Sequence, residues 1–132
     1  MSLVLPPKAR YMIVCDDVVQ DPRWPGKPVI VGLMCRVAWS GGPTTLAKMT
    51  VYLVLTDGRG AGQARVQCLN DNDGRLVFQS PAHSLSFTGR DPTRLYGVTF
   101  RLLDCHFPEP GAYLVQFLFD DVVIEERIVQ VR

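Results

Sequence analysis

The segment Phe107-Pro108-Glu109-Pro110-Gly111-Ala112-Tyr113 opens the last quarter of the chain, which runs to Arg132. It places a Pro/Gly corner and an aromatic residue before two β-rich runs, which only Asp120-Asp121 separates. A corner, an alternating strand, a tight turn and a closing strand are typical of the final hairpin of an immunoglobulin-like sandwich. The segment therefore predicts a fold. It predicts no function, because such sandwiches host many unrelated functions.

The strand that follows this corner carries aromatic and aliphatic residues at alternate positions: Tyr113, Val115, Phe117 and Phe119. Alternate residues of a strand face the same side, so we expect these four side chains to point into the core. Burying each of them stabilises the fold by about 1.5–3 kcal/mol. The spacing from Glu109 to Tyr113 resembles the tyrosine corner, in which the phenol bonds to the backbone near the preceding turn.

The rest of the chain alternates strand-like runs with turn signals, and no window keeps a helical apolar period. The segment 28–40 is expected to form one long strand with a bulge at Gly32. Asn70-Asp71-Asn72-Asp73-Gly74 is the clearest turn, because Asn, Asp and Gly tolerate positive φ. The count reaches about eight or nine strands. We therefore predict an all-β, immunoglobulin-like antiparallel two-sheet sandwich rather than a parallel α/β sheet, which needs crossover helices.

The chain has 132 residues, 47% of them hydrophobic, and a net charge of +1. This predicts one β-sandwich domain over residues 1–132, with residues 1–9 as a flexible N-terminal arm. The nearly neutral charge argues against nucleic acid or a membrane surface as a partner. The N-terminus has too few apolar residues before Pro6-Pro7 for a signal peptide, and no stretch approaches the roughly 18 apolar residues of a membrane span. We expect a soluble, cytoplasmic protein.

Four cysteines lie inside apolar, strand-like runs: Cys15, Cys35, Cys68 and Cys105. A thiol in such a run behaves as a small hydrophobic side chain, so we expect four reduced core cysteines. Zinc would need paired ligands at short spacing, and only His106 is adjacent to any of the four. An even number of cysteines also allows disulfides in an oxidising compartment. We expect no cofactor.

Two turns resemble ligand-binding loops, but their flanking residues do not fit. Asp71-Asn72-Asp73-Gly74 would need an acidic residue at Leu69 and a glutamate at Ser80 to match a calcium loop. Gly58-Arg59-Gly60-Ala61-Gly62 lacks the Gly-Lys-Ser/Thr ending of a phosphate-binding loop, and a strand follows it where a helix is needed. We interpret both segments as turns.

A catalytic set is not evident in the sequence. His83 and His106 are the two histidines, and no serine or cysteine has an evident base beside it. The chain has no Gly-x-Ser-x-Gly elbow. Catalytic groups often assemble from distant loops, so an enzyme remains the third interpretation. The sequence favours a protein that is not an enzyme.

Aspartates occur in two pairs, Asp16-Asp17 and Asp120-Asp121, with Asp57 as a third candidate. Calcium-dependent sandwiches gather aspartates in loops at one end, because hard cations need several oxygen ligands. The alternative function is therefore a ligand-binding sandwich, for carbohydrate or a divalent cation, that uses these aspartates and exposed aromatics. Against it, neighbouring strand residues such as Asp16 and Asp17 point to opposite faces. We expect no metal unless the pairs meet at one end of the fold.

The run Tyr11-Met12-Ile13-Val14-Cys15-Asp16-Asp17-Val18 is followed by Gly26-Lys27-Pro28-Val29-Ile30-Val31-Gly32. With the Asn72-Asp73-Gly74 turn and Pro110-Gly111-Ala112-Tyr113, these runs resemble an uncharacterised family of small bacterial β-sandwich proteins, a domain of unknown function. The resemblance covers nearly the whole chain. It implies a stand-alone bacterial cytosolic β-sandwich, with no known activity and no catalytic residues to transfer.

The favoured function is a non-enzymatic protein-interaction or accessory module that binds a protein partner or a second copy of itself. Edge strands of a sandwich can accept a strand from another chain. The candidate contact residues are Arg23, Trp24 and Trp39, because Trp and Arg are enriched at binding hot spots. In the competing structural interpretation, Trp39 lies in the core and Trp24 packs against the prolines of its loop.

Overall fold

The computed structural model describes residues 3–89 and 91–132. Within these residues the chain forms strands and no helix, so none of them forms a helix that could span a membrane. The strands are β1 (Lys8–Gln20), β2 (Pro28–Leu33), β3 (Arg36–Val37), β4 (Thr44–Thr56), β5 (Ala61–Asn70), β6 (Leu76–Gln79), β7 (His83–Ser86), β8 (Tyr96–Phe107), β9 (Gly111–Phe119) and β10 (Val122–Val131).

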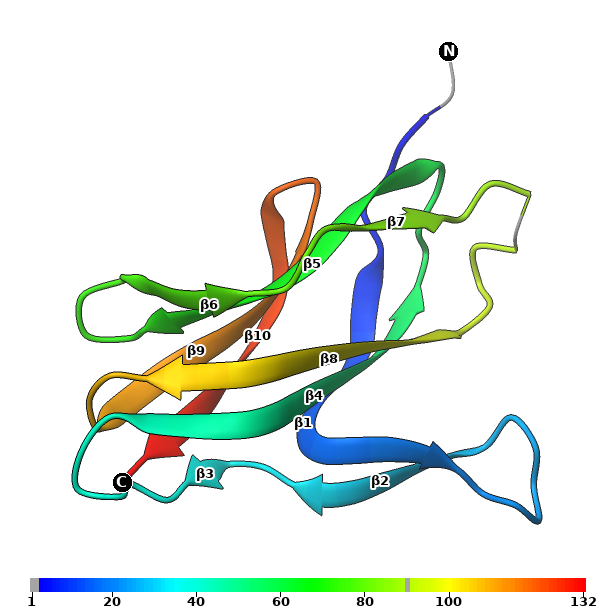
Figure 1. The fold of residues 1–132 in the computed structure, drawn as a ribbon. Coiled ribbons are helices and arrows are strands. Elements are labelled where there is room, and N and C mark those ends of the chain that lie inside the picture. Colours follow the sequence, from blue (N-terminus) through cyan, green and yellow to red (C-terminus); the bar gives the residue numbers. More distant parts are fainter. Residues whose placement is uncertain (1–2, 90) are drawn as a thin grey trace.

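These strands form two sheets that pack together (Figure 1). The four-stranded sheet has the order β2-β1-β4-β8, and the six-stranded sheet has the order β3-β10-β9-β5-β6, with β7 also paired to β5. Neighbouring strands are antiparallel, except that β3 runs parallel to β10. The all-β two-sheet fold predicted from the sequence is confirmed.

The segment 28–40, expected as one strand, is divided between the two sheets. β2 pairs with β1 in the four-stranded sheet, whereas β3 pairs with β10 in the six-stranded sheet. Gly32 has a φ of 66°, which glycine adopts without the steric cost of a side chain. The Cα partners of β2 on β1 keep the same register on both sides of this glycine. The division raises the strand count in the described residues to ten.

The start of the chain is more ordered than the expected arm of residues 1–9. Lys8 and Ala9 already belong to β1. Leu5 forms a β-bridge with Arg59, in which the two backbone N–H···O distances are 3.0 and 3.1 Å. The described part of this segment is therefore held against the turn between β4 and β5.

The core lies between the two sheets and contains the alternating residues of the central strands. On β9, Tyr113, Val115, Phe117 and Phe119 are all buried, as predicted. On β4, four inward-facing residues are fully buried: Met49, Val51, Leu53 and Leu55. The other face of β4, which carries Lys48 and Thr50, therefore points away from the core.

The tyrosine corner is present. The Oη atom of Tyr113 donates a hydrogen bond of 2.6 Å to the carbonyl oxygen of Glu109. Burial raises the pKa of the Tyr113 phenol, so the group remains a neutral donor around pH 7. The bond ties the β8–β9 corner to the first residues of β9.

Replacing Tyr113 by phenylalanine is expected to lower the free energy of unfolding by about 1–2 kcal/mol, because the Glu109 carbonyl loses its donor. Denaturant unfolding measures this loss. Tyr11→Phe is the matched control, because Tyr11 is exposed on β1. An equal loss of unfolding free energy in both variants would show that the corner hydrogen bond does not stabilise the fold.

Candidate functional site

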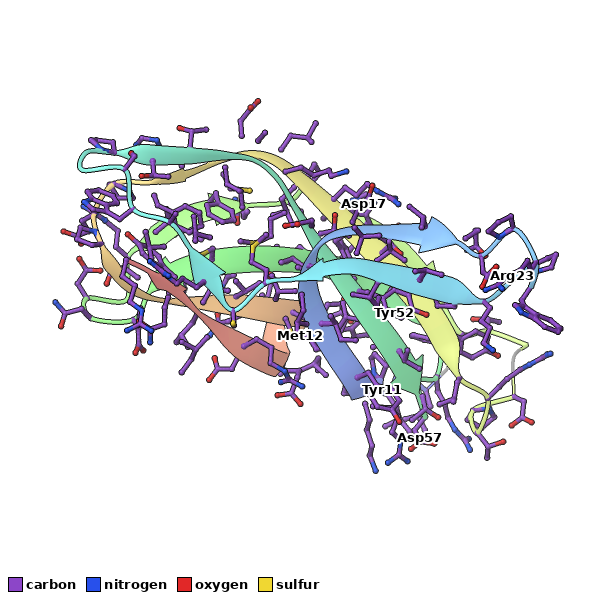
Figure 2. The ribbon with its side chains drawn as sticks, turned by 90° about the horizontal axis from the view of Figure 1, so that it is seen from below. Tyr11, Met12, Asp17, Arg23, Tyr52 and Asp57 are labelled. Carbon is purple, nitrogen blue, oxygen red and sulfur yellow. The ribbon has the colours of Figure 1, made fainter. Side chains whose placement is uncertain are left out.

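The strand β1 pairs with two different neighbours along its length. Its first half, Lys8 to Cys15, pairs with β4, and its second half, Cys15 to Gln20, pairs with β2. Figure 2 shows the resulting β1–β2 hairpin passing across β4 and β8. The hydroxyl of Thr50, on the outward face of β4, donates a 3.0 Å hydrogen bond to the carbonyl of Asp16. The β1–β2 hairpin therefore folds over the outward-facing side chains of β4 and β8.

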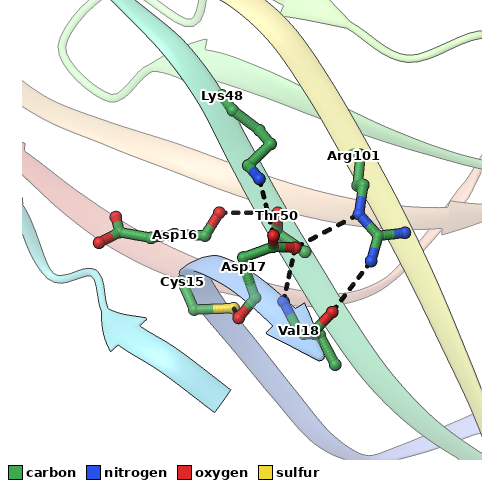
Figure 3. Close-up of polar contacts among 7 residues, drawn as sticks. All are labelled: Cys15, Asp16, Asp17, Val18, Lys48, Thr50 and Arg101. Carbon is green, nitrogen blue, oxygen red and sulfur yellow. Dashed lines mark hydrogen bonds and ion pairs between the residues drawn. The ribbon is translucent and has the colours of Figure 1, made fainter. Parts of the chain in front are cut away.

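Asp17 fixes this hairpin to β4 and β8 (Figure 3). Its carboxylate lies 2.8 Å from Lys48 Nζ on β4 and 3.4 Å from Arg101 Nε on β8. The same carboxylate accepts a 2.8 Å hydrogen bond from the backbone N–H of Val18. The Arg101 guanidinium also donates to the Val18 carbonyl at 3.0 Å. Three strands thus meet at one carboxylate.

The hydrogen bond from Lys48, followed by that from the Val18 N–H, lowers the pKa of Asp17 from 3.8 to about 2. The carboxylate is therefore fully ionised at neutral pH. Its neighbour Asp16 is exposed. The Asp16 carboxylate lies against Gly32 of β2, where the Cβ of any other residue would overlap it. The two adjacent aspartates diverge, as expected for consecutive strand residues.

The remaining candidate aspartates occupy different contacts. Asp57 lies 3.9 Å from Lys8 Nζ and 3.7 Å from an Arg10 nitrogen. Its φ of 62° places it in a turn at the end of β4. These ion pairs are partly exposed, and exposed pairs contribute little to stability.

Asp120 and Asp121 form the turn between β9 and β10, both with positive φ. The Asp120 carboxylate accepts a 2.9 Å hydrogen bond from the N–H of Gln63, and Asp121 lies 2.8 Å from Arg65. Across residues 3–89 and 91–132, no three Asp, Glu, His or Cys side chains group in a way that could hold a metal ion. The convergence that a divalent-cation site requires is absent from this part of the chain.

The three candidate contact residues separate into two environments. Arg23 and Trp24 lie in the loop between β1 and β2, where Arg23 Nε is 3.5 Å from Asp21. The Trp24 side chain is 60% exposed, and Lys27 Nζ lies 5.8 Å from its ring centroid. Trp39 is half-buried and packs against the core. The structure therefore leaves Trp24 at the surface and places Trp39 with the core.

Sequence reasoning missed three exposed apolar residues on the edge strand β2. Val29, Val31 and Leu33 are 39%, 43% and 75% exposed. The strand pairs with β1 on one side, and it is the terminal strand of its sheet. Its sequence, Pro-Val-Ile-Val-Gly-Leu, contains no charged residue. This lack of charge was the available signal, but a strand's position at an edge is not visible in the sequence.

The other sheet edges carry features that hinder pairing with another chain. β8 carries the charges of Arg101 and Asp104, and Asp104 has a φ of 54° that distorts the strand. β3 has two residues. β6 and β7 have four residues each and are separated by a segment that contains Pro81. Among the described edge strands, β2 is the longest one without a charged residue, since β6 and β7 are also uncharged but have four residues each. It also contains Pro28 and the positive-φ residue Gly32.

The cysteines correct one expectation. Cys15, Cys68 and Cys105 are buried, as predicted, but Cys35 is exposed. Burial raises the pKa of Cys68 to about 12 and that of Cys105 to about 11, so both thiols stay protonated at neutral pH. Cys35 follows β2, where the chain crosses from one sheet to the other.

Solved structures with a similar fold share little sequence identity with this chain. The alkylpurine DNA glycosylase AlkC of Pseudomonas fluorescens, bound to DNA containing an abasic site analog, aligns with a TM-score of 0.54 and 11% identity. The alignment covers 96% of this chain and 30% of the glycosylase chain. A β-glucosidase from Listeria innocua aligns with a TM-score of 0.49 and 13% identity, over 85% of this chain and 18% of the enzyme chain. At such identities the likeness concerns the fold alone.

No curated protein matches the sequence significantly. The sequence model of one protein family, described as a family of unknown function, matches residues 10–132. That match covers all of the chain except its first nine residues, and it agrees with the resemblance to an uncharacterised domain. The chain therefore belongs to the DUF6941 family, a family of unknown function.

Proposed function

We propose that this chain is a non-enzymatic protein-interaction or accessory module and that the β1–β2 hairpin is its contact surface. The observation that carries the proposal is the edge strand β2, which presents Val29, Val31 and Leu33 to solvent and contains no charged residue of its own. An uncharged edge strand is a template for pairing with another chain. Trp24 at the end of the same hairpin adds an exposed aromatic of the kind found at binding hot spots.

The composition supports a protein as the partner. The net charge of +1 gives no broad attraction for nucleic acid or for an anionic membrane. The immunoglobulin-like arrangement that we infer for the two sheets is common among proteins that act through their edges and loops. We infer a cytoplasmic location, because the cysteines are unpaired thiols and a reducing compartment maintains them so. The bacterial origin is inferred from the resemblance to a family of small bacterial proteins.

Site-specific cross-linking tests this function. Cys35→Ser provides a background without the exposed thiol, and Val29→Cys on β2 then carries a photoreactive group. In a lysate of the source organism we expect defined adducts that excess unlabelled protein removes. Val122→Cys is the matched control, because Val122 is also an exposed valine but lies at the start of β10. Identical adduct patterns from both positions would refute the assignment of the hairpin as the contact surface.

A further inference from the structure

The free edge of β2 contains a palindrome, Val29-Ile30-Val31. Asp21 N–H donates to the Lys27 carbonyl at the closed end of the β1–β2 hairpin. This bond marks Asp21 and Lys27 as a hydrogen-bonded pair. Because every second pair of an antiparallel ladder is hydrogen-bonded, the backbone groups of Val29 and Val31 are directed toward β1. The N–H and C=O of Ile30, between them, are then directed away from β1. In Figure 1, no other labelled strand lies on that side of β2.

We propose that two copies of this chain pair antiparallel along β2, about a two-fold axis through Ile30. This inference rests on the proposed function and names the partner of that surface. The pairing places Ile30 opposite Ile30 of the partner subunit, and their outward N–H and C=O groups bond each other. Two four-stranded sheets then become one continuous sheet. A two-fold interface uses the same surface on both copies, which a palindromic strand satisfies.

The side chains agree with this register. Val29 of each copy lies opposite Val31 of the other, and β-branched residues that face each other across strands stabilise a sheet. Lys27 lies opposite the other copy's Leu33, so no like charges oppose each other in the paired segment. The loop that carries Trp24 then extends past Leu33, the most exposed residue of β2. Both ends of the interface thus bring an aromatic residue toward an exposed leucine.

The charge pattern favours a second copy over a charged peptide. β2 has no acidic or basic residue with which to select a peptide of opposite sign. An identical strand needs no such complement, because it meets β2 without placing like charges face to face. The neutral segment Val29-Ile30-Val31 therefore meets a second copy of itself without a charge conflict.

Light scattering on the purified chain over a dilution series tests the pairing. We expect a mass twice that of one chain, which falls to the single-chain mass on dilution. Val31→Lys should weaken the dimer at least tenfold, because it places a charge in the apolar ladder. Val122→Lys, at the start of β10, should leave the dimer unchanged. Circular dichroism verifies that both variants are folded.

Disulfide trapping tests the register independently of stability. In the Cys35→Ser background, copies carrying Val29→Cys are mixed with copies carrying Val31→Cys and exposed to mild oxidation. Directly opposed strand residues lie within the Cα separation that a disulfide spans. We therefore expect the mixed disulfide to form several-fold faster than either homodisulfide, and Val122→Cys to cross-link slowest.

A single-chain mass throughout the dilution series would overturn the self-pairing, and so would equal rates for the mixed and identical disulfides. These results leave the proposed function standing if the β2 cross-linker captures a different protein that the Val122 position does not. The proposed function is contradicted by a different result, namely the same adducts from the cross-linker at position 29 and at position 122.

Discussion

Replacing Phe107 by alanine is expected to lower the free energy of unfolding by about 3–5 kcal/mol. Phe107 ends β8 and is fully buried. Its ring centroid lies 5.0 Å from that of Tyr113 and 5.4 Å from that of Phe78, in edge-to-face contacts. The substitution removes these contacts and leaves a cavity between the two sheets. Because a domain of this size is stable by about 5–15 kcal/mol, the variant loses a large share of its stability.

Urea denaturation measures this effect, with Leu103→Ala as the matched control. Leu103 lies on the same strand but is 69% exposed, so its truncation is expected to change stability by at most about 0.5 kcal/mol. Phe107→Leu should recover part of the loss by filling some of the cavity. Comparable losses in Phe107→Ala and Leu103→Ala would contradict the position of Phe107 in the core.

The last hairpin was the most predictable part of the fold, because its signals are local. Alternation along β9 correctly identified four buried residues, and the Glu109–Tyr113 spacing identified the corner bond. Alternation did not identify Gln116 and Leu118, which have the opposite parity and are buried as well. Each of the correctly predicted features depends on residues within one strand or one turn.

The path of β1 and β2 could not be predicted, because it depends on pairing between distant parts of the chain. β1 leaves β4 after Cys15, and the sequence there shows only an apolar run followed by two aspartates. The cations that hold Asp17 are 31 and 84 positions away in the sequence. Nothing near Asp17 indicates that Lys48 and Arg101 lie beside it.

Only the part of the candidate contact surface that depends on local sequence could be predicted. The sequence pointed to the loop with Arg23 and Trp24, because exposed aromatics in turn-rich loops can be recognised locally. It did not point to Val29 or Val31, because an uncharged β run looks the same in a central strand and at an edge. The order of strands in the sheet distinguishes these two cases.

Replacing Asp17 by asparagine is expected to loosen the β1–β2 hairpin from β4 and β8. The variant keeps the size of the side chain but loses the ion pairs with Lys48 and Arg101. Amide hydrogen exchange measures the result, with lower protection expected in β2 and little change in β9, whose core residues do not contact this site. Asp16→Asn is the matched control, because this exposed carboxylate has no ion pair among the described residues.

The pH dependence of the wild-type protein provides the second part of this test. The pKa of Asp17 is about 2 in the folded protein and 3.8 in its ordinary state, so the stabilisation from the ionised carboxylate is fully present above about pH 4. It is lost as the pH falls from about 4 to about 2, where the folded protein also takes up the proton. Protection of β2, corrected for the intrinsic exchange rate at each pH, should therefore decrease over this interval in the wild type. In Asp17→Asn the protection should already be low at neutral pH, and this decrease should be much smaller, because the asparagine does not titrate. The same decrease in both proteins would assign it to other carboxylates and remove Asp17 as the residue that holds the hairpin.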